Sequence, residues 1–172
     1  MISRKNNLLG ILCVLALVSS CRLFEQQTTS GTVAKPAFVI VNVLDKEYYD
    51  DCHIKGSINV PFENLKSYAK ANWDKDTTEI VVHCTNYKCT ASAAGWEMLH
   101  ALGFKKVFAY EGGTAEARQV GIPVEGPCKE GYLQDYEKVA STSDKKNDGE
   151  SSVVIISAED LKKKLEEFAV KA

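Results

Sequence analysis

Two cysteines, Cys84 and Cys89, follow a run of β-branched residues in the segment 79–94, EIVVHCTNYKCTASAA. Residues 79–83 predict a buried strand, and the small residues from Ala91 predict the first turn of a helix. A thiol between these elements lies where unpaired backbone N–H groups and the positive end of the helix dipole meet. Because such groups stabilise anions, we expect the pKa of Cys84 to fall below about 8.5, the value of a free cysteine.

The elements around this cysteine loop alternate between strands and helices. We predict buried strands at 38–43, 79–83 and 107–110, and helices at 64–73 and 91–102. This alternation favours an α/β fold with a parallel sheet flanked by helices. Binding residues in such sheets gather outside the carboxyl ends of the strands, which is where Cys84 falls.

The composition is that of a globular protein. The chain has 172 residues, of which 45% are hydrophobic and 26% charged, and its formal net charge is −2. This balance gives no reason to expect a nucleic-acid partner. Polar residues predict a flexible tether at 21–36 and a linker at 141–152, with one domain at 37–140 between them.

Residues 1–20 resemble a bacterial lipoprotein signal peptide. Arg4 and Lys5 form its positive region, residues 8–18 its apolar region, and small residues precede Cys21. The apolar run is short for a membrane span. We therefore expect cleavage before Cys21 and lipidation of that cysteine, for example with palmitate; the alternative is a plain secretory signal with Cys21 left free.

Lipidated Cys21 would anchor the protein to a membrane of the cell envelope, facing the periplasm or the exterior. Where a cell has two membranes, the outer one is favoured, because Arg22 rather than Asp follows the cysteine. Cys13 would leave with the signal peptide. In a compartment outside the cytosol, disulfides among the remaining cysteines can persist, but the sequence does not pair Cys52 and Cys128.

Several separated segments resemble the rhodanese-like domain family. Residues 51–61 (DCHIKGSINVP) resemble its GHIpGAiNiP signature, residues 102–113 (LGFKKVFAYEGG) its LGyknVyvyeGG, and residues 121–126 (GIPVEG) its usual ending. The cysteine loop stands where the family carries its active-site cysteine. The resemblance implies a rhodanese-like sulfurtransferase that accepts sulfane sulfur as a persulfide on Cys84 and passes it to a thiol or other acceptor.

The implied partners are a small sulfur donor, namely thiosulfate, polysulfide or a persulfide, and a thiol acceptor. A persulfide is an anion, so the residues after Cys84 form an anion-cradle loop that needs no metal or organic cofactor. Its members besides Cys89 are Thr85, Asn86, Tyr87, Lys88 and Thr90. The oligomeric state is left open.

Departures from the family pattern leave two alternatives open. Cys89 and Thr90 stand where many members have arginine and serine, and residues 42–44 (NVL) replace a common Asp-x-Arg. Cys89 could resolve a Cys84 persulfide into a disulfide, which would make the protein a thiol–disulfide or persulfide-resolving oxidoreductase. Alternatively, Cys89 is a packing residue and the domain is a non-catalytic sulfur-binding or scaffold module.

The histidines give no support to other chemistries. The resemblance makes His53 structural, and His53, His83 and the loop cysteines lack the short paired spacing of zinc ligands. A phosphatase loop would need arginine at position 90, where this chain has threonine. We expect His83 to point into packing and His100 to lie on the surface.

The C-terminal residues 153–172 predict one more strand and helix. Residues 153–156 are apolar, and Ser157 can cap a helix at 157–168 whose apolar stripe contains Leu161, Leu165 and Phe168. This segment resembles the strand and helix (isaeeLkklL) that rhodanese-like domains usually carry before their first central strand. We therefore expect a circularly permuted domain on which this segment packs; the alternatives are a loosely attached terminal helix or the start of a truncated second domain.

Overall fold

The computed structural model describes residues 34–135 and 152–169. The expected signal peptide, Cys21, most of the tether and linker residues 141–151 lie outside the described residues. No helix in the part of the chain that is described is long and apolar enough to cross a membrane.

A four-stranded parallel sheet forms the centre of the domain. Its strands lie in the order β3-β1-β4-β5, with bounds β1 Phe38–Asn42, β3 Ile58–Asn59, β4 Glu79–His83 and β5 Val107–Tyr110. The β-branched runs predicted β1, β4 and β5, because strands buried on both faces are almost continuously apolar. The expected α/β fold class is confirmed.

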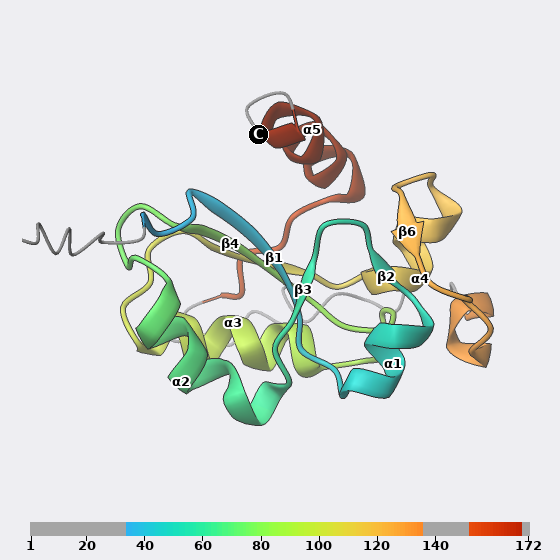
Figure 1. The fold of residues 1–172 in the computed structure, drawn as a ribbon, viewed down its shortest axis with the longest axis horizontal. Coiled ribbons are helices and arrows are strands. Elements are labelled where there is room, and N and C mark those ends of the chain that lie inside the picture. The colour runs from blue at the N-terminus through green and yellow to red at the C-terminus, as the bar shows by residue number, and fades with distance from the viewer. Residues whose placement is uncertain (1–33, 136–151, 170–172) are drawn as a thin grey trace, which may run out of the picture. The chain divides into compact units, whose positions relative to one another are not determined.

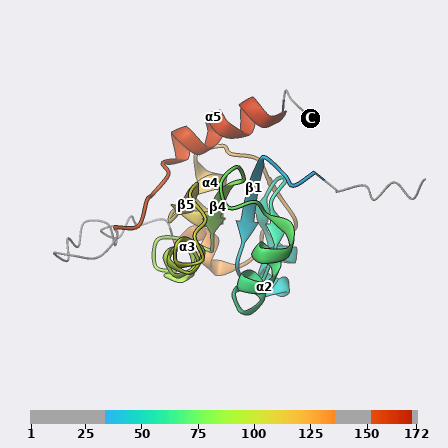
Figure 2. The same cartoon turned by 90° about the vertical axis from the view of Figure 1, so that its left-hand side faces the viewer.

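Helices cover both faces of the sheet. Helices α2 (Phe62–Asn72) and α3 (Ala91–Ala101) lie on one side, and α5 (Ala158–Ala169) lies on the other (Figures 1 and 2). Val41 and Val82 point to the first side, whereas Ile40 and Val81 point to the second. This alternation follows from the two-residue period of a strand. The helices predicted at 64–73 and 91–102 agree with α2 and α3 to within two residues.

Several short elements surround the carboxyl ends of the strands. They are α1 (Lys46–Asp51), β2 (His53–Ile54), α4 (Gly113–Gln119), β6 (Val124–Glu125) and the 3₁₀ helix η1 (Gly131–Gln134). Strands β2 and β6 form a separate antiparallel pair. The sequence did not predict these elements, because each is too short to show a helical or strand period.

The C-terminal segment lies against the same sheet. Ile155 forms a parallel bridge with Ala109 of β5, with hydrogen bonds of 2.9 and 3.0 Å on either side. We expected a strand at 153–156, but this segment forms only the one bridge. Ser157 caps α5, because its Oγ accepts a hydrogen bond of 3.1 Å from the Asp160 N–H. Leu161 of α5 is fully buried among residues of β1, β4 and β5.

Candidate active site

The two cysteines of the loop lie at the carboxyl end of β4, directly before α3. Cys84 follows the last residue of the strand and is 0% exposed, whereas Cys89 is partly exposed. Both are free thiols. The strand, loop and helix therefore place the two sulfurs as the sequence predicts, at the edge of the sheet where ligands of parallel sheets bind.

Hydrogen bonds surround both sulfurs. The thiols are hydrogen-bonded to each other, and the Cys84 thiol donates to the Cys89 carbonyl oxygen at 3.4 Å and to Ser92 Oγ at 3.5 Å. The Ser92 N–H also donates to Cys84. Cys89 receives hydrogen bonds from the Ala91 N–H, the Thr85 N–H and the Thr85 hydroxyl. The first two amides of α3 thus each face one sulfur.

The two thiols differ in acidity, and the expected low pKa of Cys84 is wrong. The neighbouring Cys89 and burial raise the pKa of Cys84 well above its ordinary value. The hydrogen bond from Cys84 and those from Ala91 and Thr85 lower the pKa of Cys89 to about 5, against the opposing effect of burial. Two adjacent thiolates repel each other, so the pair favours a single negative charge, stabilised by the hydrogen bond between the two sulfurs.

Helix α4 fixes the backbone of the loop. The N–H groups of Thr114 and Ala115 donate to the carbonyl oxygens of Cys84 and Thr85, at 3.1 and 3.0 Å. The Cys84 carbonyl and the Thr85 N–H belong to one trans peptide bond, in which the two groups point in opposite directions. Because the carbonyl points toward α4, the N–H points toward Cys89. The sequence did not predict this role of α4; its only signal was the Gly112-Gly113 pair.

Most side chains of the expected anion-cradle loop bind other parts of the protein. Asn86 donates to the Tyr132 carbonyl oxygen at 3.3 Å, the Tyr87 hydroxyl donates to Glu116 at 2.7 Å, and Lys88 forms an ion pair with Asp135. Thr90 is exposed and makes no side-chain cap to α3. Thr85, by contrast, donates from its N–H and its hydroxyl to the Cys89 sulfur.

A disulfide and η1 hold the segment beside the loop. Cys128 pairs with Cys52, which joins the end of α1 to the residues after β6. The Asp51 carboxylate accepts hydrogen bonds from the N–H groups of Lys129 and Glu130. Because η1 and Asp135 follow directly, this anchoring holds the partners of Asn86 and Lys88 in place.

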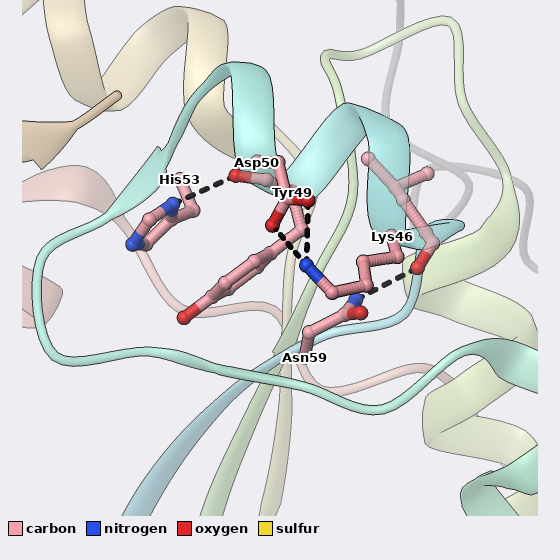
Figure 3. A network of polar contacts seen from close by, with 6 residues as sticks. Lys46, Tyr49, Asp50, His53 and Asn59 are labelled. Carbon is pink, nitrogen blue, oxygen red and sulfur yellow. Dashed lines mark hydrogen bonds and ion pairs between the residues drawn. The ribbon is translucent and has the colours of Figure 1, made fainter.

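The histidines have structural positions. His53 Nδ1 lies 2.7 Å from the Tyr49 carbonyl oxygen, and its ring stacks on that of Tyr49 at 3.9 Å (Figure 3). His83 is fully buried, and His100 is exposed with its ring stacked on Trp96. Within residues 34–135 and 152–169, no group of three or more His, Cys, Asp or Glu side chains is placed to hold a metal ion.

Comparison with known proteins identifies the family. A model of the rhodanese-like domain matches residues 25–119, which is more than half of the chain. The chain therefore belongs to the rhodanese-like domain family. No curated protein matches it.

Several solved structures are similar to this chain. A rhodanese-like domain of an Anabaena protein is 30% identical, over 52% of this chain and 99% of that one, with a TM-score of 0.48. An E. coli rhodanese with anions is 26% identical, over 52% and 99%, with a TM-score of 0.43. A thiosulfate sulfurtransferase from Pseudomonas aeruginosa is 27% identical, over 53% of this chain and 17% of that one, with a TM-score of 0.47.

Proposed function

We propose that this protein is a rhodanese-like sulfurtransferase. Its cysteine loop takes sulfane sulfur from a small donor as a persulfide and passes it to a thiol acceptor. One observation supports this function: the two free thiols receive hydrogen bonds from the first N–H groups of α3 and from the N–H and hydroxyl of Thr85. A persulfide is an anion, and such donors stabilise it without a metal or cofactor.

Both thiols are candidates for carrying the persulfide. Cys84 stands at the position that accepts sulfur in the family, as the sequence predicts, and Cys89 is hydrogen-bonded to it. That contact favours a second candidate function, a persulfide-resolving or thiol–disulfide oxidoreductase. In that reaction one thiol attacks the persulfide of the other, forming a disulfide and releasing sulfide.

Intact mass spectrometry after incubation with thiosulfate or polysulfide tests the proposal. We expect the full chain to gain one sulfur atom that a subsequent thiol acceptor removes, and we expect no such gain in the Cys84→Ser/Cys89→Ser double variant. Loss of two hydrogens instead supports the oxidoreductase. A wild-type mass that the incubation leaves unchanged would contradict both and leave a non-catalytic module.

The proposal includes a position on the cell envelope. Lipidation of Cys21 would anchor the domain to a membrane, with the domain in the periplasm or outside the cell. The disulfide between Cys52 and Cys128 fits such a compartment, because disulfides persist outside the reducing cytosol. Labelling with a palmitate analogue tests this position: we expect label on the wild-type chain and none on Cys21→Ala.

A further inference from the structure

Besides its thiols, the cysteine loop carries one charged side chain, that of Lys88 in residues 84–90 (CTNYKCT). An ammonium group at this position attracts anionic sulfur donors. Lys88, however, forms an ion pair with Asp135, whose carboxylate lies 2.5 Å from the lysine Nζ. A second carboxylate, that of Glu116, accepts a hydrogen bond from Tyr87 of the same loop. The one positive charge of the loop is therefore outweighed by the two carboxylates that bind it.

Several parts of the fold hold Asp135 beside the loop. It directly follows η1, whose Leu133 is buried and accepts a hydrogen bond of 3.3 Å from Gln119 of α4 with its carbonyl oxygen. Ahead of η1, the disulfide of Cys128 and the hydrogen bonds to the Asp51 carboxylate anchor the chain. Because the backbone that precedes Asp135 is fixed in this way, its carboxylate stays within reach of the loop lysine.

From this arrangement we infer that Asp135 determines which donors the loop accepts. By neutralising Lys88 it disfavours dianionic donors such as thiosulfate and favours the persulfides of small thiols, which carry less negative charge. Each charge beside the loop acts about twice as strongly on a dianion as on a singly charged donor. The inference rests on the proposed function and names its substrate class. It holds whichever of the two thiols takes up sulfur, because both belong to the same loop.

The transfer balances with a small-thiol persulfide as the donor. A loop thiolate attacks the outer sulfur of the protonated persulfide, a new S–S bond forms, and the S–S bond of the donor breaks. The donor thiol leaves as a thiolate with the electron pair, and the proton stays on the transferred sulfur. The loop then holds a persulfide, which loses this proton and is stabilised by the N–H groups that stabilised the thiolate.

Asp135→Asn in the full chain tests the inference, because it removes the negative charge and keeps a side chain of the same shape. Sulfur uptake is measured with thiosulfate and with cysteamine persulfide, whose ammonium group leaves it without net negative charge. We expect the variant to take sulfur from thiosulfate about three- to tenfold faster than the wild type, with no gain for cysteamine persulfide. Uptake from thiosulfate at the wild-type rate, or an equal gain with both donors, would overturn the inference.

Two controls distinguish charge from structure. Asp76→Asn removes the carboxylate of another exposed ion pair, with Lys105, which lies before the amino end of β4 and away from the loop. We expect this variant to leave both uptake rates unchanged. At about 1 M salt the gain of Asp135→Asn should fall below about twofold, because ions screen exposed charges. A gain that persists at this salt concentration would be structural and would contradict the inference.

Alkylation separates failure of the inference from failure of the proposed function, because it needs no sulfur donor. Iodoacetate, an anion, and neutral iodoacetamide are compared by their rates on the peptide that contains residues 84–89. We expect Asp135→Asn to raise the ratio of the iodoacetate rate to the iodoacetamide rate about two- to threefold. An unchanged ratio would overturn the inference even in a chain that takes up sulfur. A raised ratio in a chain that takes no sulfur would support the charge discrimination while contradicting the sulfurtransferase.

Discussion

At the scale of single residues, His83 connects the site to the core. It is the last residue of β4, it is fully buried, and its Nδ1 lies 3.3 Å from the Cys84 carbonyl oxygen. Burial lowers the pKa of His83 from 6.5 to about 4. Since the folded state prefers the neutral ring, this group contributes stability above pH 6.5 that is lost as the pH falls toward 4.

Replacing His83 should therefore flatten the dependence of stability on pH. Between pH 7 and pH 4 we expect the wild-type chain to lose up to about 3 kcal/mol of unfolding free energy to protonation of this one ring. His83→Gln removes the titrating group, so its urea midpoint should fall less over the same range, whatever its stability at pH 7.

The matched control for this prediction is His100→Gln. His100 is exposed and stacks on Trp96, so its loss leaves the buried ring in place. We expect this variant to keep the wild-type slope of stability against pH. Equal slopes for His83→Gln and the wild type would contradict the assignment of acid sensitivity to His83.

At the scale of elements, the start of α4 determines the conformation of the cysteine loop. Gly113 has a φ of +57°, and a Cβ at this position would lie 2.5 Å from the Cys84 carbonyl oxygen. Glycine thus lets α4 approach closely enough for Thr114 and Ala115 to bind the loop carbonyls. The hydrogen-bond donors of the site depend in this way on an element some thirty residues further along the chain.

Gly113→Ala should damage both stability and the site. The new methyl group must displace the loop backbone, so the Thr85 N–H should no longer face Cys89 and alkylation of Cys89 at pH 6 should slow. Gly121→Ala is the control, because Gly121 also has a positive φ of +78° but has no atom within 4 Å of its Cβ position. It should lose only about 1 kcal/mol, the cost of the left-handed backbone, and alkylate normally.

The comparison of these two glycine variants decides the role of α4. If Gly113→Ala retains the alkylation rate of Gly121→Ala, the close approach of α4 does not hold the loop, and the donors of Cys89 must be positioned by α3 alone.

The sequence predicted the long strands and helices and the location of the site, but not the short elements around it or the acidity of its thiols. Runs such as 79–83 are long and apolar enough to predict strands, and a cysteine after such a strand predicts the loop. The pKa of Cys84, however, depends on the balance between helix amides, burial and a second thiol. Burial and the orientation of Thr85 come from tertiary contacts with α2, α3 and α4, for which the local sequence carries no signal.

At the scale of the whole molecule, one disulfide joins distant parts of the chain. Cys52 and Cys128 are 76 residues apart in sequence, so their bond strongly restricts the unfolded chain. The entropy of closing a loop of this length corresponds to about 4 kcal/mol. Replacing both cysteines with alanine should lower the unfolding free energy by an amount of that order, measured in urea without reductant.

Reductant provides the control for the disulfide prediction. It should lower the urea midpoint of the wild-type chain toward that of the Cys52→Ala/Cys128→Ala variant and leave the variant itself unchanged. A wild-type midpoint that does not respond to reductant would show that this bond does not stabilise the fold.

The C-terminal segment should be required for the stability of the domain. Leu161 is fully buried and Ile156 is 4% exposed, both in the cluster that covers the face of the sheet opposite α2 and α3. Losing one large buried side chain costs about 2 to 5 kcal/mol, so deleting residues 150–172 should cost more than a single such loss. An unchanged urea midpoint would show that the segment is an appendage.

The ends of this segment also indicate how a rearranged chain could be joined. Phe168, near the end of α5, stacks on Phe38 at the start of β1, with ring centroids 4.4 Å apart. A chain in which residues 152–169 precede residue 34 through a short loop can therefore keep the bridge to Ala109, the packing of Leu161 and this stacking. If the chain is circularly permuted as predicted, an unpermuted domain would have this order, with the strand and helix of residues 152–169 before β1.

We expect the rearranged chain to fold with a urea midpoint near that of the wild type, because changing the length of a connecting loop costs only about 0.6 kcal/mol per doubling. The control is the same rearrangement with Leu161→Ala, which should lose about 2 to 5 kcal/mol if α5 packs in its original position. A rearranged chain that is no more stable than the deletion of residues 150–172 would contradict the permutation, because the segment would then depend on its place after the domain.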